Sequence, residues 1–117
     1  MSVFQVYNNR DNDIEVLFSQ TSGGVTAPID FTGASRYILK LSSGLSIDTD
    51  IGAYSDAITG NSSGVVTFRL GVLVPQIPVG TYSASFIVYD PDHIQGQVLV
   101  CADTSTEDLT FRVTDDC

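Results

Sequence analysis

The stretch Thr81-Tyr-Ser-Ala-Ser-Phe-Ile-Val-Tyr89 decides the fold class. Every second residue, at Tyr82, Ala84, Phe86 and Val88, belongs to one apolar row. A period of two is typical of a β-strand with one face turned towards a core, because successive side chains of a strand point to opposite sides. The stretch therefore predicts a strand with one buried face, as antiparallel sheets have.

The same period recurs towards both ends of the chain. In Gly64-Val-Val-Thr-Phe-Arg-Leu70 it directs Val66, Phe68 and Leu70 to one side. Five more strands are predicted at Val3–Tyr7, Ile14–Phe18, Arg36–Leu41, Gln97–Cys101 and Leu109–Val113. The total is about seven short strands, and no segment has a convincing helical period.

Seven short strands with turn residues between them are typical of two packed sheets rather than of one flat sheet. We therefore predict an all-β fold, an Ig-like antiparallel β-sandwich forming a single domain over residues 1–117. The chain has no Trp, so it lacks the Cys-Trp-Cys pattern of antibody domains. Gly23-Gly24 is expected to be a loop, and Ser42–Ser63, rich in Ser, Gly, Asp and Thr, to be the most irregular and mobile part.

Composition and charge exclude several classes of protein. A chain of 117 residues that is 43% hydrophobic and 16% charged should fold as one globule. Its net charge of −9 repels phosphate backbones and anionic lipid, so neither nucleic acid nor a membrane is an expected partner. The longest apolar stretch, Leu70–Val79, is broken by Gly and Pro and is too short for a bilayer span. The N-terminus has no secretory leader pattern, so either the chain stays where it is made or a leader was removed.

The chain offers little for catalysis. Its single histidine, His93, lies in the turn Tyr89-Asp-Pro-Asp-His93, and no GxSxG motif is present. A hydrolase that uses His93 with Cys101 or a nearby serine is the least favoured alternative. Cys101 is expected to be a small buried side chain, and a disulfide to the terminal Cys117 stays open. We assign no catalytic, cofactor-binding or metal-binding residue, and expect no enzyme activity and no cofactor.

Two weaker ligand signals have structural explanations. Pairs of carboxylates that could collect calcium occur at Asp11-Asn-Asp13, Asp48-Thr-Asp50 and Asp90-Pro-Asp92. Asp and Asn are common in β-turns, and none of these pairs fits an EF-hand loop, so turn formation is the favoured explanation. Exposed aromatics could bind sugars, but they are spread along the chain and are expected to plug the ends of the sheets; they are Phe4, Tyr7, Phe31, Tyr54 and Tyr89.

Three motifs carry a resemblance to a known group of proteins. They are Ala27-Pro-Ile-Asp-Phe-Thr-Gly-Ala34, Gly64-Val-Val-Thr-Phe-Arg-Leu70 and Ile77-Pro-Val-Gly-Thr-Tyr82. With these motifs the chain resembles small β-sandwich proteins of tailed bacteriophage virions, including the N-terminal domain of upper baseplate proteins, over about residues 13 to 113. The glycines and Pro78 of the motifs serve turns, so they explain a fold and not a reaction.

The resemblance implies a non-enzymatic structural protein of a tailed-phage virion, assembled in the host cytoplasm. Its partners would be other virion proteins, either the major capsid protein, as for a capsid decoration or accessory protein, or tail and baseplate subunits, with several copies per particle or a homo-oligomer. The segments Ser2–Tyr7 and Ser42–Ser63 are the expected docking sites, through strand addition or loop contacts. The alternative is an Ig-like adhesion or carbohydrate-binding module of a cell-surface or secreted protein, stiffened by calcium.

Overall fold

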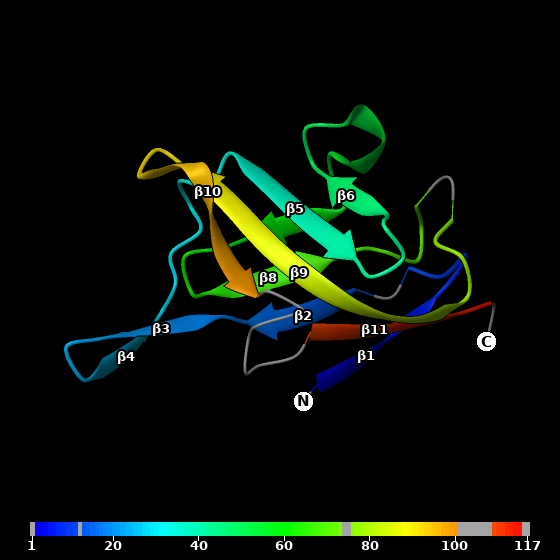
Figure 1. Ribbon diagram of the computed structural model, residues 1–117, viewed down its shortest axis with the longest axis horizontal. Coiled ribbons are helices and arrows are strands. Elements are labelled where there is room, and N and C mark those ends of the chain that lie inside the picture. The colour runs from blue at the N-terminus through cyan, green and yellow to red at the C-terminus, as the bar shows by residue number, and fades with distance from the viewer. Residues whose placement is uncertain (1, 12, 74–75, 101–108, 116–117) are drawn as a thin grey trace.

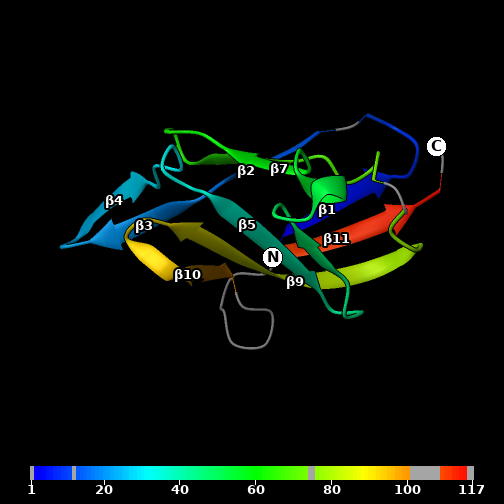
Figure 2. The same cartoon turned by 90° about the horizontal axis from the view of Figure 1, so that it is seen from above.

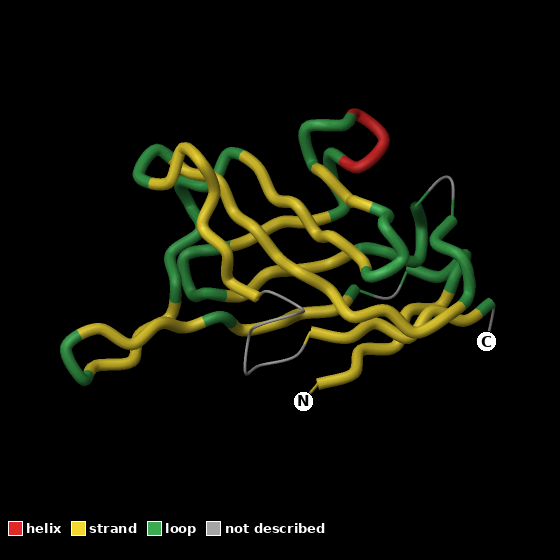
Figure 3. The backbone as a smooth tube through the Cα atoms, viewed as in Figure 1, coloured by secondary structure: helices red, strands yellow, loops and turns green. Residues whose placement is uncertain are grey.

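The computed structural model describes residues 2–11, 13–73, 76–100 and 109–115, and strands make up nearly all of its regular structure (Figure 3). One 3-10 turn, η1, spans Gly52–Tyr54. The strands are β1 (Ser2–Tyr7), β2 (Ile14–Leu17), β3 (Ser19–Ser22), β4 (Val25–Pro28), β5 (Arg36–Leu41), β6 (Ser46–Asp48), β7 (Ile58–Gly60), β8 (Val65–Phe68), β9 (Gly80–Asp90), β10 (His93–Val100) and β11 (Leu109–Thr114). The predicted all-β fold is confirmed. Within the described ranges, no helix is long and apolar enough to cross a bilayer.

Two sheets lie face to face (Figure 2). The larger sheet has the order β1-β11-β9-β5-β6, and β10 also pairs with β9. The smaller sheet has the order β2-β8-β7. Strand β9 is the longest strand and organises the larger sheet: β5 pairs with one of its sides, while β11 and β10 pair with its first and last parts (Figure 1). This is the arrangement of a β-sandwich.

The core lies between the two sheets and is rich in aromatic rings. Alternate residues of β9 face it, and Ala84 and Phe86 are fully buried. The rings of Phe86 and Phe68, which come from opposite sheets, pack edge to face with their centroids 5.3 Å apart. The rings of Phe68 and Phe111 pack in the same way at 5.6 Å. Edge-to-face pairs of this kind add to the stabilisation from buried area. The inward rows predicted for β8, β9 and β11 are therefore confirmed.

The expectation of a wholly antiparallel fold is wrong at one position. β1 pairs with β11 in parallel, in a register that runs from Ser2 opposite Leu109 to Tyr7 opposite Thr114. Because this pair joins the two ends of the chain, alternation within either strand says nothing of its direction. Such a pairing is fixed by tertiary packing rather than by local sequence.

The segment Ser42–Ser63 is more regular than expected. It contains β6, η1 and β7, and Ile47, Ala57 and Ile58 are at most 3% exposed. A few apolar side chains between polar turns are buried in the core. They are too few and too widely spaced to give a periodic pattern in the sequence. It is irregular only in its connections.

The hairpin of β3 and β4 was not predicted. Gly23 and Gly24 link the two strands with φ of 59° and 81°, and two successive residues with positive φ are typical of the tight turns that suit hairpins. The hairpin extends beyond the sandwich (Figure 1). Of the other predictions, β10 begins earlier than expected, at His93, while Cys101 and Cys117 lie outside the described residues.

Candidate interaction site at the sheet edges

Strand β1 forms one edge of the larger sheet. Within the described ranges it pairs with β11 and with no other strand. Val6 is 2% exposed and the Phe4 ring lies 6.0 Å from that of Phe111, so these side chains point inward. Val3, on the outer face, is 54% exposed. The six residues of β1 include no charge and no proline.

Side chains hold β1 firmly against β11. Gln5 donates from Nε2 to the carbonyl of Arg112 and to the hydroxyl of Thr114, both at 3.0 Å. At the end of the strand, the N–H of Asn8 donates to the carbonyl of Thr114 at 2.9 Å, and its amide donates to the carbonyl of Ile77 at 3.2 Å. One side of β1 is therefore fixed, while no described strand pairs with its other side.

The other sheet edges are less suited to strand addition. β6 and β7 have three residues each, and β2 has four, among them the exposed Glu15. The pairing of β10 with β9 contains two register shifts, and Gly96 adopts a φ of 92° there. Short strands, charges and bulges are devices that prevent edge-to-edge pairing. β1 has none of them, so it is the edge best suited to accept a further strand.

A second exposed feature is the hairpin of β3 and β4, which we call the arm (Ser19–Pro28). The side chains of Ser19, Gln20, Thr21 and all of β4 are exposed. The hydroxyls of Thr21 and Thr26 bond to each other across the hairpin at 2.8 Å. The arm carries no charge. None of its described side chains is buried against the sandwich.

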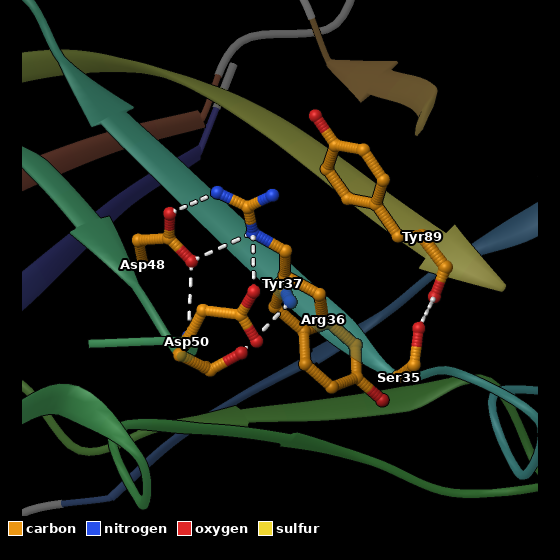
Figure 4. A network of polar contacts seen from close by, with 7 residues as sticks. Ser35, Arg36, Tyr37, Asp48, Asp50 and Tyr89 are labelled. Carbon is orange, nitrogen blue, oxygen red and sulfur yellow. Dashed lines mark hydrogen bonds and ion pairs between the residues drawn. The ribbon is translucent and has the colours of Figure 1, made fainter. Parts of the chain in front are cut away.

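The outer face of the larger sheet carries a polar cluster around Arg36 (Figure 4). Arg36 lies opposite Tyr89 in the register of β5 and β9, and its guanidinium lies 4.9 Å from the centre of the Tyr89 ring. It donates from Nε to Asp48 Oδ1 at 2.9 Å and from Nη2 to Asp48 Oδ2, and Asp50 lies 3.5 Å from Nε. The Arg36 hydrogen bonds lower the pKa of Asp48. The cluster ties β5 to the end of β6.

A shallow depression of about 340 Å³ lies beside this cluster. It is lined by Ser35, Arg36, Asp50, Tyr89, Asp90, Pro91 and Ile94. Arg36 already has two carboxylate partners, and Asp90 accepts hydrogen bonds from the Asp92 N–H and the His93 ring. The Arg36 and Asp90 side chains thus already have partners within the chain. Ile94, which is 80% exposed, adds an apolar side chain to the lining.

One carboxylate of each acidic pair that calcium could have used has a partner within the chain. Asp48 is bound by Arg36, Asp13 lies 3.6 Å from Arg69, and Asp90 shapes the turn before His93. Burial raises the pKa of Asp90, but hydrogen bonds from His93 and from the backbone together lower it below its usual value. In the part of the chain described, no group of three or more His, Cys, Asp or Glu side chains could hold a metal ion. Asp and His residues here form turns and ion pairs.

The candidate aromatics do not form one platform. Phe31 is 4% exposed and contacts Phe18 and Tyr37 in the core, whereas Phe4 packs against Phe111. Tyr54 packs partly against the core, and Tyr89 lies on the outer face beneath Arg36. Tyr7 is partly buried in β1. Phe4, Phe31 and Tyr54 thus contact the core, while Tyr89 lies outside it.

No family model, curated protein or solved structure matches this chain. Its function must therefore be inferred from its own geometry and from the motifs of its sequence. That geometry combines one open strand edge with one projecting arm. Of the two docking segments predicted from the sequence, Ser2–Tyr7 forms β1, and Ser42–Ser63 contains β6, η1 and β7. The arm was not predicted, although Gly23-Gly24 between short runs of β-compatible residues is a known hairpin signal.

Proposed function

We propose that this protein is a non-enzymatic structural subunit of a tailed-phage virion that binds other virion proteins by strand addition to β1. The observation that supports the proposal is the open edge of β1, which is six residues long, uncharged and held rigidly by Gln5 and Asn8. In strand addition, backbone hydrogen bonds supply affinity and alternate side chains supply specificity. Such an edge suits a subunit that joins many identical sites on a capsid or tail.

The fold class of the proposed relatives is supported by strand order. In Ig-type sandwiches numbered along the chain, the second, fifth and fourth strands form one sheet, and the third strand pairs with the sixth, which pairs with the seventh. When the strands are numbered without the arm and without β6 and β10, β2-β8-β7 and β5-β9-β11 follow this order. Tyr82 near the start of β9 donates its hydroxyl to the carbonyl of Pro78, as does the tyrosine at the same corner of Ig domains. We therefore include an Ig-like topology in the proposal.

The test has two parts. Mass spectrometry of particles purified from the source material should find the chain at a fixed ratio to the major capsid or tail protein. A Val3→Glu variant, supplied in place of the wild type, should lose incorporation, because a charge on the outer face of β1 opposes burial beside another strand. Val98→Glu is the matched control: Val98 is 56% exposed on the bulged strand β10, and this variant should incorporate normally.

Each result has a definite meaning. Absence of the chain from particles, or full incorporation of Val3→Glu, would contradict the proposal. Specific binding to glycans that is unaffected by Val3→Glu would instead favour an adhesion or carbohydrate-binding module. Cryo-EM of the particles would then distinguish a position on the head from one in the tail.

A further inference from the structure

The side chains of the arm are exposed, as expected of a segment that binds a partner outside its own sandwich. Val25 is 67% exposed, and no described side chain of β3 or β4 is buried. A two-stranded hairpin alone is marginally stable in water, because it has no apolar face to bury. A third strand along one side would satisfy a further row of backbone groups. The arm is therefore suited to pairing with a sheet outside its own sandwich.

The root of the arm fixes its direction. Phe18 donates its N–H to the carbonyl of Gly64 at 2.8 Å and accepts a hydrogen bond from the N–H of Ile29 at 3.1 Å. Its ring stacks on Phe86 at 5.3 Å and meets Phe31 edge to face at 6.2 Å. Phe18 thus continues both the β2–β8 pairing and the hairpin while its side chain packs against the core. The arm is held out from the sandwich rather than tethered loosely (Figures 1 and 2).

Charge restricts what can occupy the edge of β1. The whole chain carries a net charge of −9, so contacts between copies are repulsive over much of the surface. Both the arm and β1 are free of charged residues. A strand from one copy can therefore approach β1 of another copy at these two segments without bringing charged side chains into the new pairing.

We propose that the arm of one copy pairs with the edge of β1 in a second copy. β3 is the pairing strand, because Pro28 deprives β4 of one N–H donor, whereas β3 has all of its donors. The four residues of β3 fit within the six of β1. The contact joins two different surfaces, so repetition gives rings or filaments, whereas mutual exchange of arms between two copies closes a dimer. This inference rests on the proposed function, since it names the strand that the β1 edge accepts.

Sedimentation velocity over a range of protein concentrations tests the contact. Wild type should form dimers or larger species. Val3→Glu blocks the edge and leaves the arm intact, whereas Gln20→Glu charges β3 and leaves the edge intact, so each variant should associate about tenfold more weakly. Both positions are exposed, and circular dichroism should show that both variants keep the fold. Val98→Glu should associate like the wild type.

A mixture of the two variants gives the decisive result. The intact arm of Val3→Glu should pair with the intact edge of Gln20→Glu, and this pair should stop at a dimer. A photo-crosslinker placed at Thr21 should then link to residues 2–7 of the other copy. A monomeric wild type, unchanged association of Gln20→Glu, or a mixture without dimers would overturn the inference.

These outcomes separate the inference from the proposed function. If the wild type stays monomeric while Val3→Glu still fails to enter particles, β1 accepts a strand from a different virion protein and only the inference falls. If copies associate through the arm while purified particles lack the chain, the proposed function falls and the inference stands.

Discussion

The hydroxyl of Tyr82 donates a 2.6 Å hydrogen bond to the carbonyl of Pro78, four residues earlier in the chain. The bond folds the tyrosine ring back over the turn that enters β9. A Cβ at Gly80 would lie 3.2 Å from the Tyr82 hydroxyl, so a larger residue there would press on the group that makes this bond. The motif Pro78-Val-Gly-Thr-Tyr82 thus has one structural explanation, a fixed corner at the start of the central strand.

Removal of this hydroxyl should destabilise the sandwich. Tyr82→Phe keeps the ring and leaves the Pro78 carbonyl without its donor, which should lower the free energy of unfolding by about 1 kcal/mol. Urea denaturation measures the change, and its m-value should stay constant. Tyr7→Phe makes the same deletion on a partly exposed strand and should have a smaller effect. Equal effects at both positions would argue against the corner.

Gly64 should be among the least replaceable residues. It has a φ of 81°, and an added Cβ would lie 2.5 Å from the carbonyl oxygen of Phe18, at the root of the arm. Gly64→Ala should therefore cost more than the roughly 1 kcal/mol of left-handed backbone strain alone. Gly44→Ala is the matched control, because Gly44 has a φ of 97° and a Cβ added there would meet nothing within 4 Å. Thermal unfolding compares the two, and equal costs would show that the Phe18 contact relaxes freely.

The sequence predicted the parts of the fold that local alternation controls. Val66, Phe68 and Leu70 face the core, as do alternate residues of β9, because a two-residue period allows only one burial pattern. The parallel pairing of β1 with β11 was beyond such reasoning, since the partners are separated by nearly the whole chain. The arm was missed for the opposite reason: with no buried face, it has no apolar period to detect.

In the candidate site, too, local sequence predicts some features and tertiary pairing sets the others. Ser2–Tyr7 was predicted as a docking segment because it is terminal and contains a β-rich run. The Arg36 cluster could not be predicted, because it depends on two registers at once. Pairing of β5 with β9 places Arg36 opposite Tyr89, and pairing with β6 places Asp48 opposite Ile38, two residues from Arg36. Only the folded sheet brings these side chains together.

Calcium should leave the stability of the protein unchanged. The Asp48 carboxylate is bound by Arg36, and its Oδ1 also accepts a hydrogen bond from the N–H of Asp50. A calcium ion would have to displace Arg36, since it needs several free oxygen ligands. Thermal midpoints in millimolar calcium and in EDTA should agree. A clear rise with calcium would support the alternative of a calcium-stiffened adhesion module.

Acid should reduce the stabilisation that the Arg36–Asp48 pair gives to the fold. Hydrogen bonds from Arg36 lower the pKa of Asp48 below its usual value of about 3.8. The folded state therefore binds fewer protons at this site than the unfolded state between the two pKa values. The stabilisation is fully present above the unfolded pKa and is lost as the pH falls through the folded one.

Asp48→Asn isolates this contribution, because the amide has nearly the same shape and does not titrate. The side chain of Arg36 is 34% exposed, so solvent screens the pair and the variant should lose only about 1 kcal/mol at neutral pH. Asp30, whose pKa is lowered by its hydrogen bonds with Thr32, is retained in both proteins and cancels in the comparison. Urea denaturation from neutral pH to about pH 2 should show the difference between the two proteins shrinking in acid. A difference that is constant with pH would mean that Asp48 acts through its shape and not through its charge.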